Sequence, residues 1–319
     1  MDTQRIELLA RIADLYYNQN LRQEEVARRT GYSRSMISRL LTEARDEGVV
    51  EIRVNFPLDR CADLEKELRE RFHLKEARVL ARGSLSYEEM LRQVGVLAAR
   101  LVESLLNETI RTVGVSWGTA LWETANAMRP TAYAGVQVVQ VIGALDAPNA
   151  EIDGPDLARK YARLFGGYFL TLPVPLAVHN TEARDALLAD ARVRRTLDMA
   201  KNMDMLLAGM GSMEPEACSI LRAGYLSREE VLGLAQYGVA GDVCGVLFDC
   251  SGNLLATDFG LRRVGLSAED IIRTPIKIGI GGGKPKALPL MGACQAGLIN
   301  YVVTDEVAAL GALRAMSRG

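Results

Sequence analysis

The segment 21–45, LRQEEVARRTGYSRSMISRLLTEAR, has the spacing of a helix-turn-helix and leaves few other folds open to the start of this chain. A short helix from Gln23 to Arg29 is followed by the turn Thr30-Gly31-Tyr32. Gly31 stands where the turn needs a positive φ, which costs other residue types energy. Ser33 is placed to cap a second helix through its hydroxyl. The segment therefore predicts two packed helices joined by a tight turn.

The outer face of the second helix has the side chains of a DNA-reading surface. Apolar residues fall where they lock the two helices together: Val26, Ile37, Leu40 and Leu41. Exposed positions carry residue types that reach guanine edges and phosphate oxygens: Ser33, Arg34, Ser35, Ser38 and Arg39. An ordinary amphipathic hairpin is the alternative, but it does not require all these positions at once. We therefore expect double-stranded operator DNA as a partner.

The charge of this segment supports the same interpretation, although the whole chain is slightly acidic with a pI of about 5.9. Between Val26 and Leu41 the sequence holds four arginines and no acidic residue. Basic charge is therefore concentrated on the expected recognition element, as DNA binding requires.

Further elements complete a small first domain. Residues 5–17 have helical spacing, and residues 49–54 alternate like the strand of a wing. The charged segment 59–72 predicts a helix that serves as a spacer or as a dimer contact. We therefore divide the chain into a helix-turn-helix domain (1–56), a linker helix (57–74) and a large domain for effector binding and oligomerisation (75–319).

Composition points to a cytoplasmic protein without a metal or cofactor. No signal peptide opens the sequence, and no run of eighteen apolar residues could span a bilayer. The five cysteines are odd in number and lack the paired spacing of zinc sites or redox motifs.

The large domain alternates short strands with helices, which predicts a doubly wound parallel α/β sheet. The expected strands are 77–80, 112–116, 136–141, 168–172, 205–208, 243–249, 276–280 and 301–304. The expected helices are 91–106, 120–128, 155–164, 182–188, 192–201, 228–236, 285–296 and 306–316. Small molecules bind such sheets beyond the carboxyl ends of the strands.

Two segments at expected strand ends are suited to a phosphate. In 113–120, VGVSWGTA, a strand leads through glycine into a helix, so free amides and the hydroxyls of Ser116 and Thr119 face an anion. In 278–286, IGIGGGKPK, the glycines that include Gly282 and Gly283 allow close approach, and Lys286 supplies a positive charge. The alternatives are an ordinary strand–helix turn and a solvated lysine. Nucleotide hydrolysis is disfavoured, because no Ser or Thr follows the lysine to hold magnesium.

Polar residues near other strand ends are candidates for sugar binding. Asp242 stands just before an expected strand, Asp249 ends it, and Gln140 ends another. Carboxylates and amides accept paired hydrogen bonds from sugar hydroxyls. Each of these residues is also common in turns and caps, and that alternative stays open.

These motifs together resemble the SorC family of bacterial transcriptional regulators, and the resemblance covers nearly the whole chain. It is carried by ISRLL (37–41), GVSWGTAL (114–121), VVQVIG (138–143), GDVCGVLFDCSGN (241–253), GGGKPKA (281–287) and VTDEVAALGAL (303–313). The family combines a helix-turn-helix with a sugar-binding domain similar to glucosamine-6-phosphate deaminases and ribose-5-phosphate isomerases. The resemblance implies a phosphorylated sugar or polyol as effector and a tetramer built from dimers. It places Gly118, Thr119 and Lys286 at the phosphate, and Gln140 and Asp242 near the sugar.

The sequence departs from this pattern in two places. In the deoxyribonucleoside-regulator branch of the family, a lysine soon after the VVQ run forms a Schiff base with the effector. That position is Ile142 in this chain, so we expect noncovalent binding. The loop 144–147, ALDA, replaces the second glycine of the usual pair.

We therefore expect a regulator of carbohydrate metabolism rather than an enzyme. The rival hypothesis is a sugar-phosphate isomerase or deaminase with an appended DNA-binding domain, which needs a base tuned near neutral pH. The two histidines, His73 and His179, lie in the linker region and in a loop, and neither has the sequence context of such a base. A third hypothesis is a large domain that only oligomerises.

Overall fold

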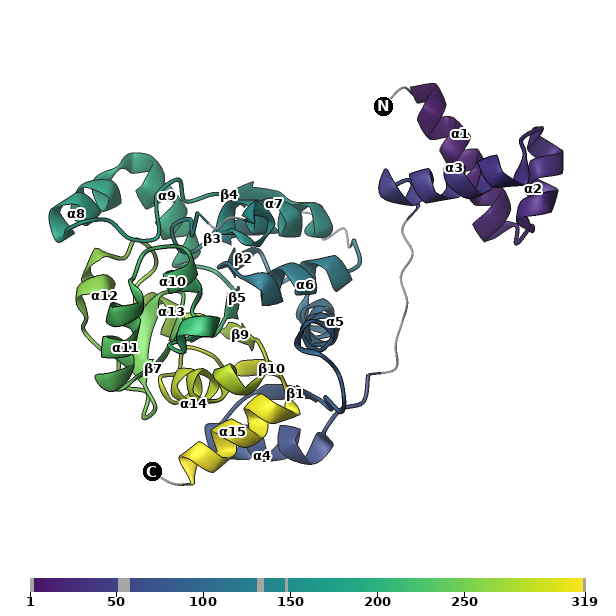
Figure 1. Ribbon diagram of the computed structural model, residues 1–319. Helices are drawn as coiled ribbons and strands as arrows, with labels where there is room; N and C mark the ends of the chain where they lie inside the picture. Colours follow the sequence, from purple (N-terminus) through teal and green to yellow (C-terminus); the bar gives the residue numbers. More distant parts are fainter. Residues whose placement is uncertain (1–2, 51–57, 131–134, 147–148, 318–319) are drawn as a thin grey trace. The chain divides into compact units, whose positions relative to one another are not determined.

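The computed structural model of the chain describes residues 3–50, 58–130, 135–146 and 149–317. The chain divides into two compact units, Met1–Pro57 and Leu58–Gly319 (Figure 1).

The first unit is a helical bundle built around the helix-turn-helix. It contains α1 (Thr3–Ala13), the π-helical turn η1 (Asp14–Asn18), α2 (Gln23–Thr30) and α3 (Arg34–Asp46). Gly31 ends α2 with φ +76°, and the Ser33 hydroxyl caps α3 by accepting the Met36 amide at 3.2 Å. The buried core comes from all three helices: Leu9, Ile12, Val26, Ile37, Leu40, Leu41 and Ala44. The predicted turn and cap are confirmed.

The structure of this unit differs from the sequence-based expectation in one helix, and part of the expected wing lies outside the described residues. The helix expected over 5–17 ends as an α-helix at Ala13, because the chain then widens into the π-helical turn. Within the expected wing strand, Val49 and Val50 form a bend, and residues 51–54 lie outside the described residues.

The second unit is an α/β/α sandwich around a seven-stranded parallel sheet. The sheet has the order β1-β10-β9-β5-β2-β3-β4. Its strands are β1 (Glu76–Leu80), β2 (Thr112–Val115), β3 (Gln137–Gln140), β4 (Tyr168–Leu170), β5 (Met205–Gly209), β9 (Ile276–Ile280) and β10 (Tyr301–Asp305). The helices are α4 (Ala62–Phe72), α5 (Tyr87–Leu105), α6 (Thr119–Ala127), α7 (Gly154–Phe165), α8 (Thr181–Ala189), α9 (Ala191–Ala200), α10 (Ser219–Arg222), α11 (Arg228–Gln236), α12 (Asp258–Arg262), α13 (Ala268–Arg273), α14 (Ala287–Gln295) and α15 (Glu306–Met316).

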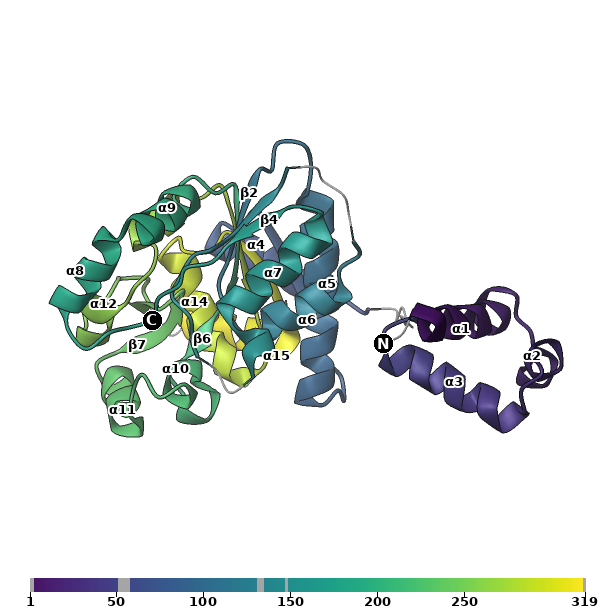
Figure 2. The ribbon, with the colours of Figure 1, turned by 90° about the horizontal axis from the view of Figure 1, so that it is seen from above.

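Helices bury both faces of this sheet, which explains why its strands are apolar on both sides. Helices α5, α6 and α7 cover one face, where Met90, Leu121 and Tyr161 are fully buried. Helices α4, α9, α14 and α15 cover the other face, where Leu68, Leu290 and Ala312 are fully buried. Figure 2 shows α5–α7 on one side of the strands, with α9 and α14 on the opposite side. The predicted doubly wound architecture is confirmed.

One predicted strand is wrong. Residues 243–249 do not form a single strand of the parallel sheet but belong to a hairpin of β7 (Val239–Val243) and β8 (Val246–Asp249). The chain reverses at Cys244 and Gly245, which both have positive φ (+52° and +71°), as a tight hairpin turn requires. With β6 (Gly211–Ser212), the hairpin forms a separate antiparallel sheet.

The helix expected to be a linker is part of the second unit. Leu68 and Phe72 of α4 are buried against the sheet, and α4 packs on β1 and α15. The hydrophobic stripe of 59–72 is therefore occupied by the chain's own core, which corrects its interpretation as a free spacer.

The order of the strands marks where a ligand would bind. The chain runs from β2 towards β4, returns to β5 on the other side of β2, and continues towards β10. The sheet therefore has its switch point between β2 and β5, where doubly wound proteins bind ligands at the carboxyl ends.

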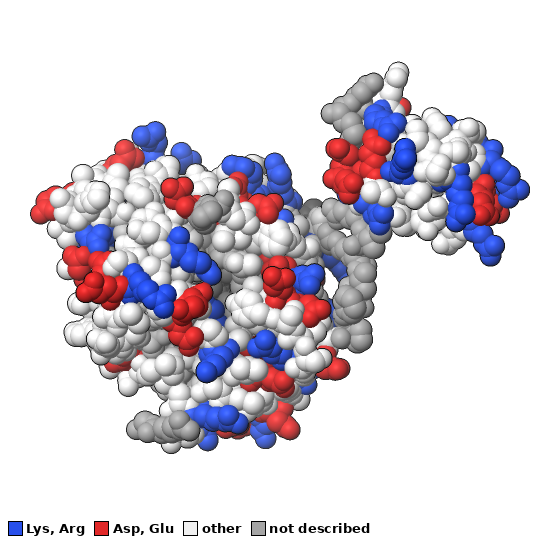
Figure 3. Space-filling view, viewed as in Figure 1, with Lys and Arg blue, Asp and Glu red and all other residues white. Residues whose placement is uncertain are grey.

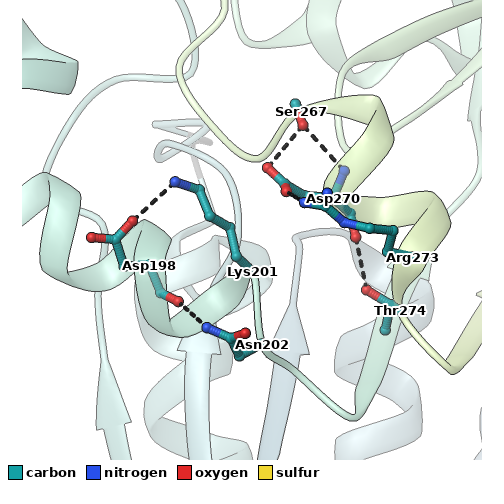
Figure 4. A network of polar contacts seen from close by, with 7 residues as sticks. All are labelled: Asp198, Lys201, Asn202, Ser267, Asp270, Arg273 and Thr274. Carbon is teal, nitrogen blue, oxygen red and sulfur yellow. Dashed lines mark hydrogen bonds and ion pairs between the residues drawn. The ribbon is translucent and has the colours of Figure 1, made fainter.

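Polar contacts close the helices at the opposite, amino-terminal edge (Figure 4). Helix α13 precedes β9, and Ser267 caps this helix and donates a hydrogen bond from its hydroxyl to Asp270 at 2.8 Å. Lys201 and Asn202 bond to Asp198 at the end of α9, just before β5. These polar groups are therefore satisfied by structural contacts.

Candidate functional site

The outer face of α3 is the candidate DNA-binding surface. All five predicted residues on it are exposed: Ser33, Arg34, Ser35, Ser38 and Arg39. The Ser33 hydroxyl already caps the helix and lies 3.0 Å from the Ser35 hydroxyl. Arg34 lies 3.6 Å from Glu24 of α2, with both side chains largely exposed. Figure 3 shows basic side chains at the α2 end of this unit with acidic ones among them.

A two-bonded ion pair holds α3 against α1. Arg5 Nε donates to Glu43 Oε1 at 2.7 Å, and its Nη2 donates to Oε2 of the same carboxylate at 2.5 Å. The Arg5 guanidinium holds the pKa of Glu43 below its usual value. Arg5 and Glu43 therefore fix the orientation of α3 relative to α1, one helical turn beyond Arg39.

The second unit contains a cavity of about 300 Å³ at the carboxyl ends of its central strands. The cavity is lined by the segments that follow β2, β5 and β9, together with Asp242 and Cys244 from the β7–β8 hairpin. It therefore lies at the switch point of the sheet. Six of the predicted effector residues line it: Ser116, Gly118, Thr119, Asp242, Gly282 and Lys286.

The start of α6 forms one wall of this cavity. Gly118 has φ +125° and donates its amide to Ile152 O at 2.8 Å, so that amide is not available to a ligand. Its carbonyl accepts the amides of Leu121 and Trp122, which begins the helix. The amides of Thr119 and Ala120 are the first in α6, where a helix attracts an anion.

The segment after β9 carries Lys286 into the same cavity. Gly283 starts the 3-10 turn η4 (Lys284–Lys286) with φ +87°. Burial lowers the pKa of the Lys286 ammonium, while the negative charge of Asp242 favours its protonated form. Among the described residues, no carboxylate lies within 4.0 Å of this ammonium. Lys286 is therefore a partly buried cation without a direct ion pair in the described chain.

Asp242 is fixed on the floor of the cavity. Its side chain is 3% exposed, and Oδ2 accepts the Gly245 amide at 2.9 Å. A Cβ atom on Gly211 would lie 1.7 Å from Asp242 Oδ1, so glycine is required opposite this carboxylate. Burial raises the pKa of Asp242, while Lys286 and Arg263 favour its ionised form. Asp242 offers an oriented carboxylate to a hydroxyl group in the cavity.

Two predicted residues do not line the cavity. Gln140 is fully buried: its amide nitrogen donates to Ile142 O at 2.8 Å, and its oxygen accepts the Leu172 amide at 2.9 Å. Leaving such buried backbone groups unpaired costs about 1–3 kcal/mol each, so Gln140 has a structural role. The Gly283 amide donates to Asp305 at 2.8 Å and is likewise engaged within the protein.

Several lining residues were missed by the sequence interpretation. Tyr87 of α5 and Met210, Glu214 and Arg222 from the segment after β5 all line the cavity. The segment 210–222 contains only the two-residue strand β6 and the four-residue helix α10, which are too short to give a periodic pattern. Nothing in the sequence therefore indicated that this segment folds back over the strand ends. Only proximity to β5, which leads into the cavity, could have suggested Met210.

The described residues contain no cluster of three or more side chains suited to a metal ion. His73 ends α4 and His179 is exposed, and neither lines the cavity. In the part of the chain that the structure describes, no helix is long and apolar enough to cross a membrane.

Comparisons with known proteins agree with this arrangement. The family described as "Putative sugar-binding domain" matches residues 57–314. The Deoxyribonucleoside regulator of Bacillus subtilis is 28% identical over 309 residues, with 96% of this chain and 97% of that protein covered. The Sorbitol operon regulator of Klebsiella pneumoniae is 30% identical over 307 residues, with 94% and 96% covered. The crystal structure of the full-length sorbitol operon regulator SorC from Klebsiella pneumoniae superposes with a TM-score of 0.74 at 29% identity, covering 98% of this chain and 99% of that one.

Proposed function

Because this chain belongs to the SorC family of sugar-binding transcriptional regulators, we propose that a phosphorylated sugar or polyol in the cavity controls its binding to operator DNA. The relatives named above are regulators and not enzymes, and this chain is a regulator as well. The observation that carries the proposal is that Thr119 and Lys286 line one cavity although they are far apart in sequence.

The two residues supply what a phosphate needs. The first amides of α6 and the Thr119 hydroxyl donate hydrogen bonds, and the Lys286 ammonium contributes a point charge. Asp242 accepts hydrogen bonds from the sugar hydroxyls at the other side of the bound molecule. The cavity volume is in the range of small-molecule sites.

The effector binds noncovalently in this proposal. Ile142 is fully buried and apolar at the position where the related branch has its imine-forming lysine. Lys286 is the one lysine among the described residues that line the cavity, and its role is to hold the phosphate. The operator-binding face is the exposed side of α3, and the protein acts in the cytoplasm, where it regulates genes of carbohydrate metabolism.

A thermal-shift screen of the full chain tests the effector class. At a concentration of about 100 times its Kd, a ligand adds about 2.7 kcal/mol of stability and raises the Tm of the second unit by about 5 °C. We expect this shift from at least one phosphorylated sugar or polyol and not from its dephosphorylated form. Equal Tm shifts with the phosphorylated and dephosphorylated forms would contradict the phosphate site. The phosphorylated compound that raises the Tm should also change operator affinity in a gel-shift assay.

We further propose a homotetramer built as a dimer of dimers. A single helix-turn-helix buries too little surface for tight specific binding, so two half-sites are engaged together. Light scattering at micromolar concentration should give about four times the 34.8 kDa mass of one chain. A monomer that binds its operator with full affinity would rule this assembly out.

A further inference from the structure

Two acidic residues at the end of β10 contact three separate segments of the second unit. Asp305 is fully buried, and its Oδ1 accepts the Gly283 amide at 2.8 Å and the Ala308 amide at 3.1 Å. The first of these bonds reaches the segment that carries Lys286, and the second caps α15. Asp305 therefore joins the wall of the cavity to the start of a helix.

The bond to Gly283 ties Asp305 closely to the position of Lys286. Gly283 O accepts the Lys286 amide at 2.9 Å, which closes the turn η4. A Cβ atom on Gly283 would lie 3.1 Å from the Tyr87 ring, so the turn has little free space. Gly283 therefore links the backbone of Lys286 to the Asp305 carboxylate through two consecutive hydrogen bonds.

The remaining carboxylate oxygens of this pair face the loop after β1. Asp305 Oδ2 is buried, has no hydrogen-bond partner and lies 3.6 Å from Arg82 Nη1. Glu306 Oε1 accepts the Gly83 amide at 3.2 Å. Because a buried carboxylate oxygen without a partner is costly, small shifts of the loop that bring Arg82 closer are favourable.

The same loop and β1 hold the segment that leads to the first unit. Cys61 donates its amide to Val79 O, and Ala81 donates its amide to Asp59 O, both at 2.9 Å, so residues 59–61 run antiparallel to the end of β1. The Cys61 thiol also lies 3.7 Å from Glu306 Oε2. Glu306 therefore contacts both the loop after β1 and the first residues of the second unit.

We propose that Asp305 and Glu306 transmit occupancy of the cavity to residues 58–61, from which the chain continues to the DNA-binding unit. The proposal rests on the proposed function, because it requires an anion at Lys286. Asp305 and Glu306 are positioning residues: Asp305 senses η4 through Gly283, and Glu306 holds Gly83 and Cys61. Residues 58–61 are the first residues of the second unit, and the chain joins them covalently to the first unit.

Hydrogen exchange of the full chain, with inorganic phosphate as the probe, tests the relay. In the wild-type protein, phosphate should slow exchange by about threefold or more in peptides covering 281–287 and also in those covering 58–64 and 79–84. In Glu306→Ala, the response at 281–287 should remain while the response at 58–64 disappears. Glu306→Gln keeps an acceptor oxygen for the Gly83 amide, and this variant should show the wild-type response at 58–64.

The outcomes separate this inference from the phosphate site itself. If 281–287 responds in the wild-type protein but 58–64 does not, the relay is wrong and the phosphate site stands. A response at 58–64 that persists in Glu306→Ala also overturns the relay. If phosphate leaves 281–287 unchanged in the wild-type protein, the phosphate site and the relay both fail. Glu306 is only partly buried at the start of α15, so the alanine variant should fold.

Discussion

Replacing Lys286 with alanine should abolish the response of operator binding to a phosphorylated effector and leave effector-free DNA binding nearly unchanged. The substitution removes the cation that faces the cavity beside the first turn of α6. A hydrogen bond to a charged group contributes about 1.5–3 kcal/mol, so effector affinity should fall by at least about tenfold. Calorimetric titration of the effector gives its Kd, and anisotropy of a labelled operator gives DNA affinity with and without it.

The chain offers a matched control for this variant. Lys284 lies two residues earlier in the same turn, is exposed and does not line the cavity. Lys284→Ala removes the same charge from the same segment and should keep wild-type effector affinity. If Lys286→Ala also keeps wild-type effector affinity, the shared phosphate site is wrong, whereas the proposed DNA-binding surface on α3 is not affected by that result.

The cavity was largely predictable because its walls follow a local sequence rule. The segments around Thr119 and Lys286 each run from an apolar strand through glycine into a helix. Parallel strands bring such segments to one edge of a sheet, so sequence separation does not matter. This prediction requires only that β2 and β9 run in the same direction in one sheet. The order of the strands between them is not needed.

The predictions for Gln140 and for residues 243–249 were wrong because the same residue types occur in more than one structural environment. Gln140 ends a buried strand, as a ligand-binding amide would, yet it pairs with the backbone of Ile142 and Leu172. The β7–β8 hairpin was missed because Cys244 has φ +52° in its turn. Cysteine rarely adopts positive φ, so its presence in the sequence does not indicate a turn. In both cases the sequence shows the residue type, but the tertiary fold decides which groups that residue contacts.

The same limit applies to α4. Its stripe of Leu64, Leu68 and Phe72 indicates an apolar face, and a spacer, a dimer contact and a packed helix all require one. The structure places this face against β1 and α15, and α15 is more than 200 residues further along the chain. Periodicity identifies the buried face of a helix but does not say what covers it.

Alanine in place of Arg34 or Arg39 should weaken operator binding by about 1–3 kcal/mol, or roughly 5- to 150-fold, where the side chain reads a base pair with two hydrogen bonds. Both residues are exposed on α3, and Arg39 lies one turn beyond Ser35. Anisotropy on an operator selected from a random DNA pool measures the change at fixed salt. Arg11→Ala, which removes an exposed charge from α1, is the matched control and should have little effect.

The ion pair between Arg34 and Glu24 adds a test of opposite sign. An exposed pair at 3.6 Å contributes at most about 1 kcal/mol, so Arg34 is readily released to DNA. Glu24→Gln removes this competitor and a negative charge near the phosphates, and it should therefore strengthen operator binding. In the double variant Glu24→Gln/Arg34→Ala there is no Arg34 side chain to release. The increase in operator affinity caused by Glu24→Gln should therefore be smaller than in the single variant. If neither arginine variant changes operator affinity and Glu24→Gln has no effect, the outer face of α3 is not the reading surface.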